Sequence, residues 1–89
     1  MLKISEVESN LQGALLKLEG KISGDSVAEM QRICHSVLEG ATSLRLDLAE
    51  VTFADRGGVK ALAELRSRGV EMVNCSVFLT EQLKALRSE

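Results

Sequence analysis

Residues 43–69 decide the fold, and they read S-L-R-L-D-L-A-E-V-T-F-A-D-R-G-G-V-K-A-L-A-E-L-R-S-R-G. In the first half of this stretch, leucines alternate with Arg45 and Asp47, a pattern typical of a strand that is covered on one face only. Val51 and Phe53 continue the apolar character toward Asp55. The stretch therefore begins as a strand and reaches a turn at Asp55.

The second half of the stretch has the features of a helix with marked ends. Asp55 suits the N-cap, where a carboxylate accepts hydrogen bonds from free N–H groups and meets the positive end of the helix dipole. Gly69 tolerates the left-handed conformation that often ends a helix. Charged pairs four residues apart, Lys60 with Glu64 and Glu64 with Arg68, indicate a solvated face. The opposite face carries apolar residues at helical spacing: Val59, Leu62, Ala63 and Leu65.

The chain before this stretch predicts a hairpin and a long helix. We expect strands over residues 2–7 and 14–18, a turn over 9–13, and a small polar loop over 20–24 that is anchored by Ile22. Ser26 and Glu29 fit a capping box, which places the helix start at Ser26. Gly40 is the expected stop of this helix. Its apolar stripe consists of Val27, Met30, Ile33, Cys34, Val37 and Leu38.

After the central stretch we expect a short strand over residues 70–73 and a final helix capped by Ser76, with Phe78 or Leu79 and then Leu83 on its apolar face. The order is β-β-α-β-α-β-α, and helices join the last three strands. These strands should run parallel through right-handed crossovers, while the first strand pairs antiparallel at or near an edge. The predicted fold is a single α/β domain over residues 1–89: a four-stranded mixed sheet with helices mainly on one face.

Composition limits the function classes. The chain has 89 residues with 45% apolar content, which suits one small globular core, and its only aromatic residues are Phe53 and Phe78, so the core should be aliphatic. A net charge of −2 and the lack of Trp and Tyr give no basis for nucleic-acid binding. No apolar run approaches a membrane span and no signal peptide opens the chain, so we expect a cytoplasmic protein without direct membrane insertion.

The cysteines and the histidine of the sequence also give little support for a catalytic site or a metal site. Cys34 and Cys75 are isolated in the sequence, so we expect them to serve as small buried apolar residues. Their number and spacing favour neither a disulfide framework nor a zinc site. His35 is the only histidine. It is next to Cys34, but neighbours on a helix point in different directions and cannot form a nucleophile–base pair, so we expect a solvated surface histidine. We predict no enzyme activity, no metal and no cofactor.

The segment D-L-A-E-V-T-F-A-D-R-G-G-V resembles the signature of the STAS domain, a family that includes bacterial anti-sigma factor antagonists and sulfate transporters. In that signature, Asp-Ser-Ser-Gly or a similar run opens a helix. Asp55 and Gly58 match its Asp and Gly, whereas Arg56 and Gly57 stand where the two hydroxyl residues usually lie. The segment V-E-M-V-N-C-S-V-F-L-T-E-Q-L is similar to the closing strand and final helix of the family, so the resemblance covers most of the chain.

The resemblance implies a bacterial, non-enzymatic binding module. In the antagonist family, the domain docks on an anti-sigma factor that is also a serine kinase, and this partner switching regulates transcription. Phosphorylation of a serine at the helix start ends the docking. That position is Gly57 here, and no Ser or Thr lies between Ala54 and Leu65. The resemblance therefore implies an antagonist-like module without the usual switch.

We hypothesise that two segments form the docking surface, because loops that follow parallel neighbouring strands open at the same end of a sheet. The residues are Ser23, Gly24, Asp25, Asp55, Arg56, Gly57, Gly58, Val59 and Lys60. Two alternative functions stay open. One is an accessory subunit that binds the ATPase of a lipid ABC transporter, and the other is a small-anion site near Arg56 at the helix start. A homodimer is a further option.

Overall fold

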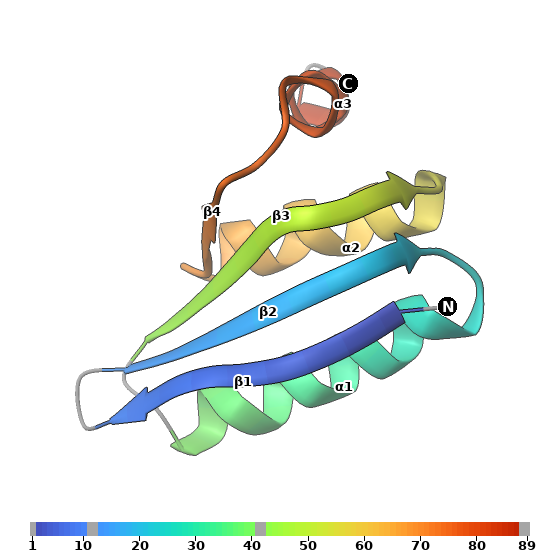
Figure 1. Cartoon of the computed structure of the whole chain (residues 1–89). Coiled ribbons are helices and arrows are strands. Elements are labelled where there is room, and N and C mark those ends of the chain that lie inside the picture. The colour runs from blue at the N-terminus through green and yellow to red at the C-terminus, as the bar shows by residue number, and fades with distance from the viewer. Residues whose placement is uncertain (1, 11–12, 41–42, 88–89) are drawn as a thin grey trace.

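The computed structural model describes residues 2–10, 13–40 and 43–87, and the element order confirms the predicted β-β-α-β-α-β-α arrangement. Figure 1 shows the elements. Their bounds are β1 Leu2–Asn10, β2 Gly13–Ile22, α1 Asp25–Gly40, β3 Leu44–Ala54, α2 Arg56–Ser67, β4 Glu71–Val73 and α3 Val77–Arg87.

The strands form one sheet in the order β1-β2-β3-β4. β1 pairs antiparallel with β2, whereas β2 with β3 and β3 with β4 pair in parallel, as predicted. The helices α1 and α2 lie side by side on one face of the sheet, and α3 packs against α2 (Figure 1). The carboxyl ends of β2 and β3 therefore lie at the same end of the sheet, and the chain enters α1 and α2 from that end.

The core between the sheet and the helices is aliphatic, as composition predicted. The alternation in β3 buries Leu44, Leu46 and Leu48 and leaves Arg45 exposed. The apolar stripe of α1 also faces the core: Met30 and Cys34 are buried and the other four residues are partly buried. Burial raises the pKa of the Cys34 thiol to about 11, so this cysteine behaves as a small apolar residue.

Several predicted boundaries were wrong. β1 continues beyond Val7 to Asn10, so the expected turn begins later, and residues 11–12 of that turn lie outside the described part of the chain. Gly20 to Ile22 belong to β2 and not to a loop, because the pairing with β3 continues to the end of that strand. The expected stop of the long helix is correct to within one residue, because α1 ends with Gly40 as its last residue.

The start of α1 was also misplaced. The helix begins at Asp25, because Gly24 adopts a φ of 56° that turns the chain one residue earlier than a cap at Ser26 would. The N–H of Ser26 donates to the carbonyl of Ser23 at 3.1 Å, and the N–H of Val27 donates to that of Gly24 at 3.2 Å. Ser26 is thus inside the first turn, and the capping box does not mark the helix start.

The ends of α2 and the start of α3 follow the predictions. Gly69 has a φ of 97°, its N–H donates to the carbonyl of Arg66, and the N–H of Val70 donates to that of Leu65, which together close a Schellman motif. The hydroxyl of Ser76 accepts from the N–H of Leu79 at 3.1 Å and so caps α3. Leu79 is buried, whereas Phe78 is 65% exposed.

Candidate functional site

Asp55 caps α2, as its sequence position predicted. Its backbone is extended, with φ −79° and ψ 179°, and its Oδ1 accepts a hydrogen bond from the N–H of Gly58 at 2.7 Å. The carbonyl of Asp55 accepts from the N–H of Val59 at 2.9 Å, which is the first helical hydrogen bond. The carboxylate therefore satisfies one of the N–H groups that every helix start leaves unpaired.

The same carboxylate also holds the loop that precedes α1. Oδ2 of Asp55 accepts from the N–H of Gly24 at 3.2 Å, and the N–H of Asp55 donates to the carbonyl of Ile22 at 3.1 Å. These bonds join residues that are about thirty positions apart in sequence, at the neighbouring ends of β2 and β3 (Figure 1). The expectation that the two loops lie together at one end of the sheet is confirmed.

The two glycines after Arg56 have different surroundings. A Cβ on Gly58 would collide with the carbonyl oxygen of Ile22 and approach the Cγ2 of the same residue to 2.9 Å, so a side chain there would push α2 away from β2. A Cβ on Gly57 would meet only Oδ1 of Asp55, at an ordinary 3.5 Å. Packing thus explains Gly58 but gives no reason for Gly57.

The predicted site residues divide by exposure. Ser23 and Asp55 are partly buried, whereas Gly58 and Val59 are buried, with Val59 only 4% exposed because its side chain faces the core. The two buried residues support the surface from beneath and do not form it. The exposed residues at this end of the sheet are Gly24, Asp25, Arg56, Gly57 and Lys60. Their backbone and side chains form the open part of the predicted surface.

Among the described residues, the basic side chains at the start of α2 make no ion pair. Arg56 and Lys60 lie four residues apart at the exposed start of α2, and neither has a carboxylate partner. The predicted pairing of Glu64 is with Arg68 alone, at 3.7 Å and in the last turn. The start of α2 therefore presents two basic side chains to solvent, close to the Asp55 carboxylate and on the same surface as the exposed Asp25.

Phe53 lies on the open face of β3. It continues the apolar character of the strand, yet it is 47% exposed, which agrees with the expected aliphatic core. The register of β3 against β2 shifts between Lys17 and Glu19 and again between Gly20 and Lys21. The second shift leaves Thr52 out of register, with its hydroxyl donating to the carbonyl of Gly20 at 3.2 Å. A break in the alternation of apolar residues after Leu48 was the only sequence signal for this irregularity.

Two hollows lie away from the proposed docking surface. One, of about 310 Å³, is lined by His35, Leu38, Glu39 and Arg68. His35 is half-buried and its Nε2 is buried without a hydrogen-bond partner in the described structure, so the prediction of a solvated surface histidine was wrong. Arg68, from the end of α2, lines the hollow together with His35, and the sequence of α1 alone does not reveal this neighbour.

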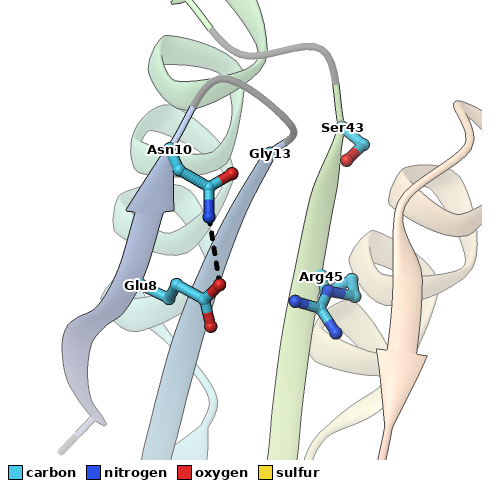
Figure 2. A pocket seen from close by; sticks show the side chains of 5 residues that line it. All are labelled: Glu8, Asn10, Gly13, Ser43 and Arg45. Carbon is cyan, nitrogen blue, oxygen red and sulfur yellow. Dashed lines mark hydrogen bonds between the residues drawn. The ribbon is translucent and has the colours of Figure 1, made fainter.

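The second hollow, of about 230 Å³, lies at the opposite end of the sheet. Its lining comes from the end of β1 and the starts of β2 and β3: Glu8, Asn10, Gly13, Ser43 and Arg45 (Figure 2). The Asn10 amide donates to Glu8 at 3.1 Å across its rim. Within the described ranges, no three His, Cys, Asp or Glu side chains are grouped to hold a metal ion, and no helix is long and apolar enough to cross a membrane.

Comparison with known proteins gives a consistent fold. A family model described as "Mlab, STAS domain" matches residues 5–88. The structure of the anti-sigma factor antagonist SpoIIAA in its unphosphorylated form is similar, with a TM-score of 0.71 and 16% identity over 92% of this chain and 82% of that chain. An uncharacterized protein of the DUF3478 family from Shewanella loihica PV-4, with a SpoIIAA-like fold, gives a TM-score of 0.59 and 15% identity over 86% of this chain and 69% of that one. Among curated proteins, none matches this sequence.

Proposed function

The chain belongs to the STAS domain family, and from this premise we propose that it is a non-enzymatic module that binds a partner protein in the bacterial cytoplasm. The observation that carries the proposal is the bridge made by Asp55, which holds the loop before α1 against the start of α2. A surface whose two halves are fixed in advance loses little conformational freedom when a partner binds. Gly57 lies open on this surface without a packing reason for its missing side chain.

The first candidate partner is an anti-sigma factor of the serine-kinase type. The family docks such partners through the start of this helix, and the family's phosphorylated position is Gly57 here. A glycine cannot accept a phosphate, so the module acts as an antagonist that binds but is not released by phosphorylation at this position. The unpaired Arg56 and Lys60 beside Gly57 favour a partner surface that carries carboxylates.

The second candidate partner is the ATPase subunit of a lipid transporter, since STAS-like domains also bind such subunits. A docking surface that cannot be phosphorylated suits a permanent subunit better than a switch. A small-anion site is less well supported, because the Asp55 carboxylate already occupies the N–H of Gly58 and repels an anion.

An affinity pull-down with identification of bound proteins by mass spectrometry tests the proposal. The tagged wild-type chain should recover one partner, and Gly57→Trp should lose that partner because the indole covers the open surface. Recovery of a kinase-like anti-sigma factor supports the first candidate, and recovery of a transport ATPase supports the second. Equal recovery by the wild type and the variant would place the interface elsewhere.

The missing switch is tested by incubation with ATP and the recovered partner. If the partner is a kinase, the wild-type chain should take up no phosphate at the start of α2, whereas Gly57→Ser should take up one phosphate there. The added dianion would exclude the partner by desolvation and clash. A phosphorylated Thr52, or any phosphorylated residue between Thr52 and Ser67, would show that the switch has moved and is not lost.

A further inference from the structure

The end of β3 carries an aromatic side chain on the open face of the sheet, next to the strand end that leads into α2. Lys21 pairs with Phe53, and Ile22 pairs with Ala54. Paired residues of parallel strands point to the same face, so Phe53 shares the face of Lys21, opposite to the helices, and Ala54 shares the buried face of Ile22. The two extra residues of β3 cancel in phase, so Phe53 also lies on the same face as Arg45.

Two features meet at this end of the sheet. The small Ala54 is buried next to Asp55, close to where Gly58 packs on Ile22, and Phe53, the only aromatic residue of the strand, is 47% exposed on the other face. Phe53 is three residues before Arg56 and pairs with Lys21, which is two residues before Ser23, so it lies where both strands lead into the proposed docking surface.

The charges around the ring are mixed. Lys21 lies beside it and Arg56 follows it, while Glu19 and Glu50 pair with each other two positions back along β2 on the same face as Lys21. None of these four side chains has an ion-pair partner within the described structure. A uniformly anionic surface such as a lipid bilayer would meet the two glutamates as repulsive groups. A protein partner can place carboxylates toward Lys21 and Arg56 and a basic group toward the glutamates.

We propose that Phe53 is the apolar anchor of the docking interface and inserts into an apolar pocket of the partner protein, with acidic partner residues facing Lys21 and Arg56. This inference rests on the proposed function and extends the interface from α2 onto the open face of the sheet. An aromatic side chain that is surrounded by charged groups and becomes desolvated on binding has the properties of an interface hot spot.

Photocrosslinking tests the position of the anchor. The photoreactive residue p-benzoylphenylalanine replaces Phe53, Lys60 or Phe78, one at a time, in cells that contain the natural partners. Phe78 is the matched control, because it is an exposed phenylalanine on α3. Position 53 should form an adduct with a protein other than this chain, on a peptide that contains Asp or Glu, and position 78 should not form an adduct with that protein.

The outcomes separate this inference from the proposed function. Adducts at position 60 without adducts at position 53 would overturn the anchor and leave docking through α2 intact. No adduct at either position would contradict both. An adduct at position 53 only with lipid, or only with a second copy of this chain, would also overturn the anchor.

Affinity measurements with the crosslinked partner complete the test. Phe53→Ala should weaken binding by about 30-fold, the effect of a typical hot-spot residue, whereas Phe78→Ala should change it by less than about threefold. Lys21→Glu should weaken binding and make it less sensitive to salt. Thermal unfolding followed by circular dichroism should show that Phe53→Ala is folded. Its unfolding midpoint should be near that of the wild type, since Phe53 is half exposed. Unchanged affinity of folded Phe53→Ala would overturn the proposal.

Discussion

The carboxylate of Asp55 joins two loops, because its Oδ2 lies 3.2 Å from the backbone nitrogen of Gly24 while its Oδ1 accepts from Gly58 at 2.7 Å. One side chain thus caps α2 and holds the entry into α1. Both oxygen atoms serve as acceptors, so no other residue type reproduces the arrangement. The geometry of the docking surface depends on this single group.

Substitution of Asp55 tests the two hydrogen bonds separately. Asp55→Ala removes both and should lower the free energy of unfolding by about 0.5–2 kcal/mol, the usual range for loss of an N-cap. Asp55→Asn keeps an acceptor for Gly58 but turns an amide N–H₂ toward the N–H of Gly24, so its loss should be smaller than that of Asp55→Ala and still measurable. Urea unfolding of the three proteins measures this, and equal losses in both variants would contradict the capping account.

The two adjacent glycines of α2 should respond in opposite directions to alanine. Gly57→Ala has room for its methyl group and gains helix propensity, so stability should rise by up to about 1 kcal/mol. Gly58→Ala forces a methyl group against the carbonyl of Ile22 and should lose about 1–3 kcal/mol. Thermal unfolding of the matched pair measures both effects. A destabilised Gly57→Ala would show a packing role for Gly57 and remove one argument for docking.

Much of this arrangement follows from local sequence patterns. The alternation from Leu44 to Leu48 predicts which face of β3 is buried, and Asp55 and Gly69 predict the ends of α2, because caps and strand alternation depend on short-range geometry. The start of α1 was mispredicted because Gly24 and Ser26 both offer plausible starts. The φ of 56° at Gly24 decides between them, and the bond to Asp55 holds that loop from a distant part of the chain.

The features that sequence reasoning missed depend on contacts between strands. β3 carries two extra residues relative to β2, one between Asp47 and Glu50 and one between Val51 and Phe53, and nothing in the period-two pattern of one strand reports its pairing with another. The difference between Gly57 and Gly58 likewise depends on how close α2 comes to Ile22. The burial of His35 depends on the surroundings of α1 and not on its own periodicity.

Acid should weaken a contact between β3 and the segment after β4. The N–H of Ala49 donates to Asp47 at 3.0 Å and the Asn74 amide donates at 3.1 Å, and these bonds, helped by the charge of Lys17, lower the pKa of Asp47 below its usual range. A folded-state pKa below the unfolded value of about 3.9 contributes stability above that pH, and the contribution disappears as the pH falls through the folded-state pKa.

Asp47→Asn isolates this effect, since the amide oxygen still accepts but carries no charge. The wild type should be more stable than the variant by a constant amount above about pH 5, and the difference should shrink as the pH falls below about 4. Unfolding free energies from pH 2 to pH 7 measure it, with Glu50→Gln as a control that replaces an exposed carboxylate on the same strand. A difference that does not change with pH would contradict the assigned role of the charge.

The two thiols should differ in reactivity. Cys34 is buried with a pKa raised to about 11, so very little thiolate exists at pH 8, whereas Cys75 is only partly buried. Iodoacetamide should alkylate Cys75 well before Cys34 in the native protein, and both should react at similar rates in denaturant. Peptide mass spectrometry over time distinguishes the two sites. Alkylation of Cys34 at the rate of Cys75 in the folded protein would show that α1 opens readily.

The central claim is that the partner binds the open backbone around Gly57, and the dissociation constant of Gly57→Trp tests it most directly. Gly40→Trp is the matched control, because Gly40 is also an exposed helical glycine with open space around it. It lies at the C-terminal end of α1, whereas the docking surface includes the N-terminal end of that helix. Isothermal titration with the recovered partner should give wild-type affinity for Gly40→Trp and at least about 100-fold weaker binding for Gly57→Trp, with similar thermal midpoints for both. Wild-type affinity in a folded Gly57→Trp protein would contradict the account.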